Sequence, residues 1–174
     1  MDCNILKNYR PVTNLTFISK ILEKLVFNQL IEYLSSNDLI EKFQSAYKAG
    51  HSTETALLRV ANDILCSVDT GSVAMLTMLD LSAAFDTLDH QILLDRLFSS
   101  FGICDTALNW FKSYLENRKQ KVKINSHYSD ELFISFGVPQ GSVLGPLLFT
   151  MYVYPISDVM KNKGFDFHLY ADDA

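Results

Sequence analysis

The stretches that decide the fold are MLDLSAAFD at residues 78–86 and LYADDA at residues 169–174. Each places carboxylates at the end of an apolar, strand-like run: Asp80 in the first, and Asp172 with Asp173 in the second. Buried strands seldom end in neighbouring acids, because adjacent carboxylates repel each other and need solvent or a cation. Oxygen ligands from three acids suit Mg²⁺, and two such ions about 3.5–4 Å apart are the standard arrangement for in-line phosphoryl transfer. The two stretches therefore predict a two-metal site, although a cap at a strand end would also explain Asp80, and exposed pairs of aspartates occur in many turns.

Composition is typical of a folded protein of ordinary size. The 174 residues suffice for one domain, or for one domain and part of another. A hydrophobic content of 48% excludes a wholly disordered chain. The net charge of -5 is unusual for a nucleic-acid enzyme, which normally carries a basic surface. The predicted metal ligands are part of that acidic count, so the net charge does not exclude a nucleic-acid partner.

Cysteines and apolar stretches indicate the compartment. Cys3, Cys66 and Cys104 form no C-x-x-C motif, and they indicate neither a disulfide framework nor a zinc site. The N-terminus lacks the basic-then-apolar pattern of a signal peptide. The longest apolar stretch, residues 143–156, is too short to span a bilayer and is interrupted by glycine and proline. We therefore expect an intracellular protein, in the cytoplasm or nucleus, with no membrane partner.

Hydrophobic periodicity predicts mostly helices joined by a few strands. A first helix is expected from Leu15 to Leu34, capped by Asn14 or Thr16, and a second from Ser52 or Thr53 until Gly71. A central, doubly buried strand is expected at 73–81, followed by helices at 89–101 and after a capping Asp105. Strands are expected at 119–124 and 132–136, with a turn at Asn125 and Ser126. A buried helix at 142–160 and an alternating run at 165–169 complete the chain.

Five segments, in their order along the chain, resemble the reverse transcriptase domain of non-LTR retrotransposons of the LINE, jockey-like type. They are NYRPV at 8–12, AYKAGHST at 46–53, LDLSAAFD at 79–86, GVPQGSVLGPLLF at 137–149 and YADD at 170–173. The resemblance covers essentially the whole chain and stops just after the YADD motif.

The resemblance implies an α+β fold. The expected architecture is a polymerase palm, with an antiparallel sheet and helices on one face, plus mostly helical fingers and no thumb. Residues 1–174 would then be a partial reverse transcriptase domain, with about 1–71 fingers-like and about 72–174 palm. A fingers-like insertion is expected near 105–136.

Roles for the acids also follow from the resemblance. Asp80 and Asp172 are expected to be the main metal ligands, with Asp173 as the third acid and the Leu81 carbonyl as a backbone ligand. Two Mg²⁺ ions, for which Mn²⁺ is a substitute, lower the pKa of a primer 3′-hydroxyl and neutralise charge on the triphosphate. No side-chain nucleophile is needed.

Four further residues match the family's nucleotide-binding positions. Phe85 matches the steric gate, where a ring under the sugar excludes a 2′-hydroxyl, although a core role would also explain it. Gln140 and Gly141 match the loop that contacts the incoming nucleotide and the template, and a plain strand-to-helix connector is the alternative. Lys48 stands where many relatives have arginine, so the charge for the triphosphate is kept without a bidentate fork.

Primer and template contacts are expected at Arg10 and Tyr170. Arg10 pairing with an acid, and Tyr170 as an ordinary strand residue, explain these positions as well. Lys119, Lys121 and Lys123 share one strand face, which fits either a phosphate-tracking stripe or, slightly better, a solvated surface.

The first functional hypothesis is a fragment of an RNA-directed DNA polymerase. Its partners would be an RNA template, a DNA primer and deoxynucleoside triphosphates; the oligomeric state is not predicted. The alternative is a non-catalytic remnant, inactive alone or serving as a nucleic-acid or protein binding module. A third option is a relative of group II intron or telomerase polymerases, against which the 137–149 segment argues.

Overall fold

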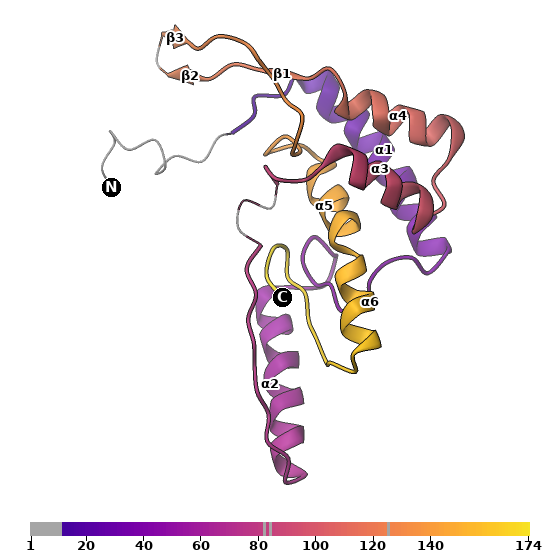
Figure 1. Cartoon of the computed structure of the whole chain (residues 1–174), viewed down its shortest axis with the longest axis vertical. Helices are drawn as coiled ribbons and strands as arrows, with labels where there is room; N and C mark the ends of the chain where they lie inside the picture. Colours follow the sequence, from indigo (N-terminus) through magenta and orange to yellow (C-terminus); the bar gives the residue numbers. More distant parts are fainter. Residues whose placement is uncertain (1–11, 82, 84, 125) are drawn as a thin grey trace.

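The computed structural model describes residues 12–81, 83, 85–124 and 126–174 (Figure 1). Arg10, Cys3 and Asn125 therefore lie outside the described residues. The elements are α1 (Phe17–Ser36), α2 (Thr53–Asp69), α3 (His90–Ser99), α4 (Asp105–Leu115), β1 (Lys119–Gln120), β2 (Lys123–Ile124), β3 (His127–Tyr128), β4 (Leu132–Phe133), α5 (Gly145–Val153) and α6 (Pro155–Asn162). The fold is thus a mixture of helices and small sheets.

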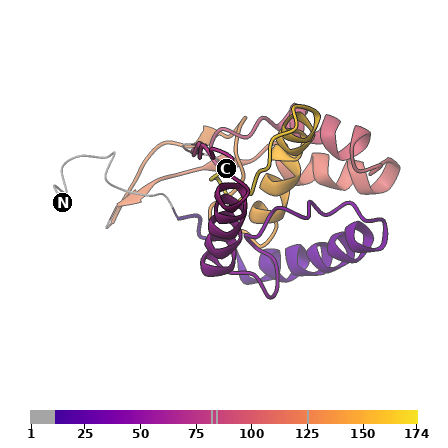
Figure 2. The ribbon, with the colours of Figure 1, turned by 90° about the horizontal axis from the view of Figure 1, so that it is seen from below.

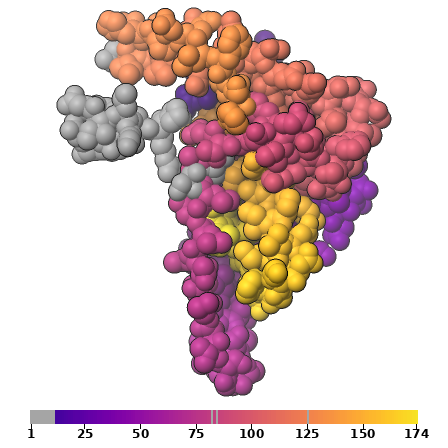
Figure 3. All heavy atoms as spheres, viewed as in Figure 1, coloured from indigo at the N-terminus to yellow at the C-terminus, as the bar shows by residue number. Residues whose placement is uncertain are grey.

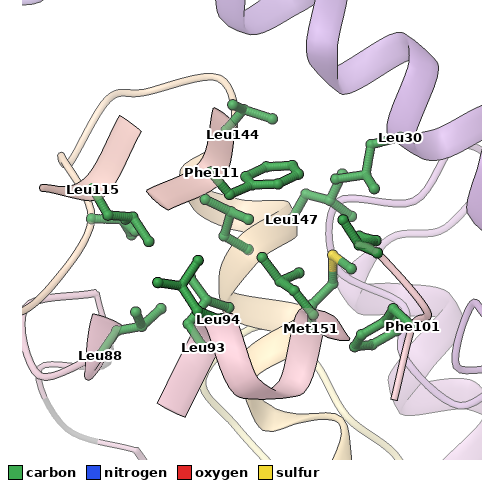
Figure 4. Close-up of a cluster of buried hydrophobic side chains, with 14 of the residues drawn as sticks. Leu30, Leu88, Leu93, Leu94, Phe101, Phe111, Leu115, Leu144, Leu147 and Met151 are labelled. Atoms are coloured by element: carbon green, nitrogen blue, oxygen red, sulfur yellow. The ribbon is translucent and has the colours of Figure 1, made fainter. Parts of the chain in front are cut away.

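The hydrophobic core lies between α1, α3, α4 and α5. Figure 4 shows Leu30 of α1, Leu93 of α3, Phe111 and Leu115 of α4, and Met151 of α5 converging there, and all five are almost fully buried. Figure 2 shows α1 on one side of the body and α3 and α4 on the other. Burial of one such side chain contributes about 1.5–3 kcal/mol, so this cluster holds the four helices together.

Helix starts follow the capping signals of the sequence. The Thr16 and Asp89 side chains accept hydrogen bonds from backbone N–H groups in the first turns of α1 and α3. Ser52 and Thr55 form a reciprocal capping box at the start of α2. The expectation for Asp105 is wrong: the N-cap of α4 is Cys104, and Asp105 is the first helical residue.

The expected buried helix at 142–160 is two helices. Pro155 has no N–H to continue the hydrogen-bond ladder of α5, and α6 begins at this proline. Residues 142–144 precede α5 as a turn, so the helical part starts at Gly145. In the described part of the chain, no helix has both the length and the apolar character needed to cross a bilayer.

The strands predicted between 119 and 136 are present but short. β1 pairs with β4 and β2 pairs with β3, both antiparallel, and all four strands are exposed. Lys119 and Lys121 lie 3.3 and 2.9 Å from the carboxylate of Glu131. Two of the three lysines in the predicted stripe therefore already have an acidic neighbour, and the solvated-surface interpretation fits better than phosphate tracking.

The prediction of a doubly buried strand at 73–81 is wrong. Val73 and Met75 are 99% and 90% exposed, and no described strand lies beside residues 73–78. The expected antiparallel palm sheet is likewise absent from the described residues, which form only the two small sheets and isolated bridges. A run of apolar residues favours extended backbone, but burial also needs neighbouring strands on both edges.

Residues 53–79 extend away from the helical body. Figures 1 and 3 show α2 projecting from it, with the following extended segment running back along the helix. Of the α2 side chains only Ala56 is buried. This projecting segment, residues 53–79, is called the excursion below. It returns to the helical body at Leu79, where the chain pairs with the hairpin formed by residues 170–174.

Candidate metal and nucleotide site

The YADD segment forms a tight hairpin turn. The Tyr170 N–H donates to the Asp173 carbonyl at 2.9 Å, and the Asp173 N–H donates to the Tyr170 carbonyl at 3.0 Å. Ala171 has a φ of 57°, in the left-handed region that L residues rarely adopt. The turn therefore places Ala171 and Asp172 at its tip, with the backbone strain at Ala171, and Asp173 pairs with Tyr170 at its base.

The segment around Asp80 pairs with this hairpin. Leu79 and Ala174 exchange both backbone hydrogen bonds, at 2.7 and 2.9 Å, and the Leu81 N–H donates to the Asp172 carbonyl at 2.9 Å. Asp80 and Asp173 are thereby directly opposite in a non-hydrogen-bonded antiparallel pair. In such a pair the Cα atoms are only about 4.5 Å apart and the side chains leave the same face.

Asp80 and Asp173 are both exposed, so solvent screens part of the repulsion between their carboxylates. Like charges directly opposite on neighbouring strands destabilise a sheet. A divalent cation between them removes the repulsion, and carboxylate oxygens are the ligands that Mg²⁺ prefers. The donor chemistry and the backbone juxtaposition of Asp80 and Asp173 therefore fit a metal ion.

The third acid does not complete a cluster. Asp172 is half-buried and stands next to Asp173, but its backbone pairs with Leu81 and not with Asp80. In the described part of the chain, no three His, Cys, Asp or Glu side chains lie close enough to hold one metal ion. The structure thus brings the backbones of the three acids together without gathering all three side chains around one point.

A second loop lies beside the Asp80 segment. The Val138 N–H donates to the Phe85 carbonyl at 2.8 Å, and the Gly137 N–H donates to the Leu88 carbonyl at 2.6 Å. A Cβ on Gly137 would approach the Phe85 carbonyl oxygen to 2.7 Å, so only glycine fits there. The Gln140 amide then reaches across to both carboxylate oxygens of Asp86, at 3.1 Å each.

The residues predicted to contact the nucleotide differ in how far they are buried. Phe85 is half-buried and its ring lies 5.2 Å from that of Phe149, so the core role and the gate role are compatible with its position. Gly141 is exposed and Lys48 is half-buried. Arg10, expected at the template, lies outside the described residues.

A single family accounts for nearly the whole sequence. Residues 3–174 match the family described as "Reverse transcriptase (RNA-dependent DNA polymerase)". The chain belongs to the reverse transcriptase family.

Individual relatives of this reverse transcriptase chain are proteins of mobile elements. It is 34% identical over 174 residues to the "Probable RNA-directed DNA polymerase from transposon X-element" of Drosophila melanogaster, an alignment covering 96% of this chain and 18% of that protein. It is 35% identical over 176 residues to the "RNA-directed DNA polymerase from mobile element jockey" of the same species, covering 96% and 19%. The predicted jockey-like resemblance is confirmed, and the chain spans less than a fifth of the length of these relatives.

Sequence reasoning missed the part of the reverse transcriptase chain that supports the hairpin. Residues 43–47 run beside residues 168–171: the Leu169 N–H donates to the Phe43 carbonyl at 2.8 Å, and the Ser45 N–H donates to the Leu169 carbonyl at 3.0 Å. The buried Gln44 side chain also accepts a hydrogen bond from the Ala171 N–H. This contact can be recognised only in the folded structure, because Gln44 and Ala171 are 127 residues apart in the sequence.

Tyr47 belongs to the AYKAGHST motif, which assigns it no role. It has a φ of 59° and stands close to the acidic turn. Burial raises the pKa of the Tyr47 phenol, and the charge of Asp172 and the neighbouring Tyr170 raise it further. The surroundings of Tyr47 therefore disfavour its phenolate form.

Glu23 is a second residue without a sequence signal. Its side chain in α1 is 1% exposed, and its carboxylate accepts the Val143 N–H at 2.6 Å and the Leu144 N–H at 3.4 Å. These N–H groups directly precede α5, at the end of the loop that carries Gln140 and Gly141. Glu23 thus anchors the loop expected to contact the nucleotide.

Proposed function

We propose that this chain is the metal-binding and nucleotide-binding part of an RNA-directed DNA polymerase that adds deoxynucleotides to a primer. The observation that carries the proposal is the pairing of Asp80 with Asp173 across two strands that meet at the YADD turn. The names of the relatives, which are RNA-directed DNA polymerases of mobile elements, point the same way.

Each proposed residue has a distinct task. Asp80, Asp172 and Asp173 would hold the two Mg²⁺ ions, with the Leu81 carbonyl as a further oxygen ligand and Mn²⁺ as a substitute. When bound, the metals supply charge neutralisation at the triphosphate and a lower pKa for the primer hydroxyl. Lys48 contributes a positive charge toward the triphosphate phosphates.

The remaining residues select and orient the substrate. The Phe85 ring closes the space that a ribose 2′-hydroxyl would need, and its contact with Phe149 keeps the ring in place. Gln140 and Gly141 orient the nucleotide and template, while Tyr170 and Arg10 contact primer and template. The partners are an RNA template and a DNA primer, inside the cell.

The subdomains are proposed on the same grounds. Residues from about 1 to 71 correspond to fingers and those from about 72 to 174 to palm, with a fingers-like insertion near 105–136.

A non-catalytic fragment is the second candidate function. It is favoured by two observations on the described residues: the side chains of 73–78 are largely exposed, and the three acids do not form one cluster. A chain in this state would bind a divalent ion weakly and would not extend primers by itself.

The test combines metal binding with primer extension. We expect Asp80→Asn to lower the Mn²⁺ affinity of the chain by more than about a hundred-fold, because even outer-shell partners of metal ligands are worth about 10–100-fold. Asp69→Asn, an exposed acid at the end of α2, is the matched control and should bind Mn²⁺ like the unchanged chain.

Primer extension with deoxynucleotides on an RNA template then separates the candidates. Extension that depends on Asp80 supports the polymerase. Mn²⁺ binding that depends on Asp80 without any extension favours the non-catalytic fragment. Equal Mn²⁺ affinity in Asp80→Asn and the unchanged chain would show that Asp80 is not a ligand.

A further inference from the structure

The 43–47 segment connects the fingers motif to the acidic turn through one buried side chain. Gln44 is 6% exposed, and its backbone forms a parallel bridge with Leu169. Its Oε1 atom accepts the Ala46 N–H at 2.9 Å and the Ala171 N–H at 3.3 Å. One side-chain oxygen therefore holds both its own loop and the residue between Tyr170 and the two aspartates.

We propose that Gln44 is a positioning residue of the polymerase site, which holds the YADD turn in the conformation that presents its acids. The proposal rests on the proposed function, since it concerns the orientation of the same metal ligands. Gln44 itself touches neither metal nor substrate in this role.

The contact falls on the strained residue of the turn. Ala171 is the only residue of YADD with a positive φ, at 57°, and the left-handed conformation costs an L residue about 1–2 kcal/mol. The two hydrogen bonds within the turn join its ends, Tyr170 and Asp173, and leave the Ala171 N–H unused. Gln44 supplies an acceptor for that N–H. This hydrogen bond stabilises the turn with Ala171 in its left-handed conformation and so offsets part of the strain.

The orientation of the amide follows from its neighbours. Two backbone N–H groups point at one end of the Gln44 side chain, so that end must be the oxygen. The Nε2 atom is buried without a hydrogen-bond partner among the described residues. A buried unpaired donor is unfavourable for stability, and the side chain is therefore better explained by its contact with the turn than by packing alone.

Two further ties place this segment against the hairpin strand. The Ser45 hydroxyl lies 2.8 Å from His168 Nε2, and the Phe43 ring stands edge-on to Phe167 at 5.2 Å.

Glu41, just before the segment, lies 2.7 Å from Lys161 of α6. Burial alone would raise the pKa of the Glu41 carboxyl, but the Lys161 ammonium brings it below its ordinary value. These contacts dock the strand without the Gln44 side chain, whose oxygen adds a tie to the Ala171 N–H of the turn beside its tie to the Ala46 N–H.

Three variants of Gln44 separate the hydrogen bond from the packing. Gln44→Met keeps the length of the side chain and removes the acceptor. Gln44→Asn stays polar but is one methylene too short to reach Ala171, and it carries the test if the Met variant does not fold. Gln44→Glu keeps acceptor oxygens, but it places a buried carboxyl beside Asp172 and Asp173, so it should restore the contact only in part. Ser45→Ala is the matched control, because it removes a buried side-chain contact to the same strand without touching the turn.

The first readout is hydrogen exchange at the Ala171 amide, with the amides of α3 reporting that the core is folded. We expect Gln44→Met and Gln44→Asn to accelerate this exchange about five-fold, the value of one ordinary hydrogen bond, Gln44→Glu to accelerate it less, and Ser45→Ala to leave it unchanged. Unchanged exchange at Ala171 in a folded Met or Asn variant overturns the proposal.

The second readout is Mn²⁺ affinity of the whole chain. We expect the Met and Asn variants to bind Mn²⁺ about ten-fold more weakly, as outer-shell changes do, and Ser45→Ala to bind it normally. Faster Ala171 exchange with unchanged Mn²⁺ affinity also overturns the proposal, because the turn would then not need Gln44 to present its acids. If the unchanged chain and Asp80→Asn bind Mn²⁺ equally, the proposed function fails, while the exchange result still decides the contact.

Discussion

Glu23 shows how one buried carboxylate fixes a loop from a distant helix. It lies in α1 and accepts the N–H groups of Val143 and Leu144, which precede the first turn of α5. A negative charge near a helix N-terminus is favourable, because the free N–H groups there carry partial positive charge. Burial, followed by the Glu23 charge, raises the pKa of the neighbouring Tyr114 to about 12. The carboxylate thus organises a polar cluster inside the core.

The residue-scale prediction concerns the stability that this anchor provides. Glu23→Leu leaves two backbone N–H groups without their acceptor, and each unsatisfied buried donor costs about 1–3 kcal/mol. We expect Glu23→Leu to lower the free energy of unfolding by about 2–5 kcal/mol in urea denaturation. Glu23→Gln keeps an oxygen and should lose less. The exposed Glu32 of the same helix provides the control, Glu32→Gln, which should change little.

A different outcome would be informative at this scale. If Glu23→Leu and Glu32→Gln unfold at the same urea concentration, the N–H groups of Val143 and Leu144 find other acceptors. Glu23 would then be a buried acid without a structural task.

The loop from Gly137 to Gly141 is positioned by close backbone packing. Gly137 has a φ of 81°, and a Cβ there would lie 2.7 Å from the Phe85 carbonyl oxygen and 2.9 Å from the Asp86 Cα. Gly164 has a similar φ of 72° but nothing within 4 Å of the same position. Both glycines therefore have a left-handed backbone, but only at Gly137 do other atoms come close to the position of an added Cβ.

The element-scale prediction uses this pair. Gly164→Ala should cost only the left-handed strain, about 1–2 kcal/mol. Gly137→Ala should cost about 1–3 kcal/mol more in thermal or urea unfolding, because the added methyl group pushes the two loops apart. Equal destabilisation by both changes would mean that the loops around Phe85 and Gln140 separate easily.

Local signals predicted the helices better than the strands. Thr16 and Ser52 stand at helix starts where the sequence placed them, because a cap and the first turn lie within a few residues of each other. The apolar run at 73–81 predicted a buried strand, but a strand is buried by segments elsewhere in the chain. Within the described residues no strand lies beside 73–78, whose side chains are exposed, and only residues 79–81 have a neighbour, the YADD hairpin on one edge.

The excursion of residues 53–79 divides the molecule into a stable and a less stable part. α5 buries six of its residues, whereas α2 buries only Ala56. Segments with few buried apolar side chains open at a lower free energy than the core.

The whole-molecule prediction follows from this difference. Amides of α2 should exchange with solvent at least about ten-fold faster than those of α5, measured by hydrogen exchange with mass spectrometry at neutral pH. α3, which contributes Leu93 and Leu97 to the core, should behave like α5. Protection of α2 equal to that of α5 would show that the excursion is covered, for example by a second copy of the chain.

The acids and their supports differ in how far the sequence could predict them. Asp80, Asp172 and Asp173 stand in motifs whose order along the chain identifies the family, and the structure pairs the first with the last. Gln44 and Glu23 carry no such signal, because each acts on backbone N–H groups more than a hundred residues away. Whether the three acids share metal ions remains a prediction for the experiments above.

Because Leu79 pairs with Ala174, the number of residues in each of the two paired segments determines which face its acid occupies. In a two-stranded ribbon, a shift of one residue turns every side chain to the opposite face. A single-residue insertion or deletion just before Asp80, or between Leu169 and Asp173, would therefore aim one acid away from the other even though neither was substituted. During divergence of related genes, gaps should accumulate at the tip beyond α2 and at the hairpin joining β2 to β3, and should be rare in these two strands.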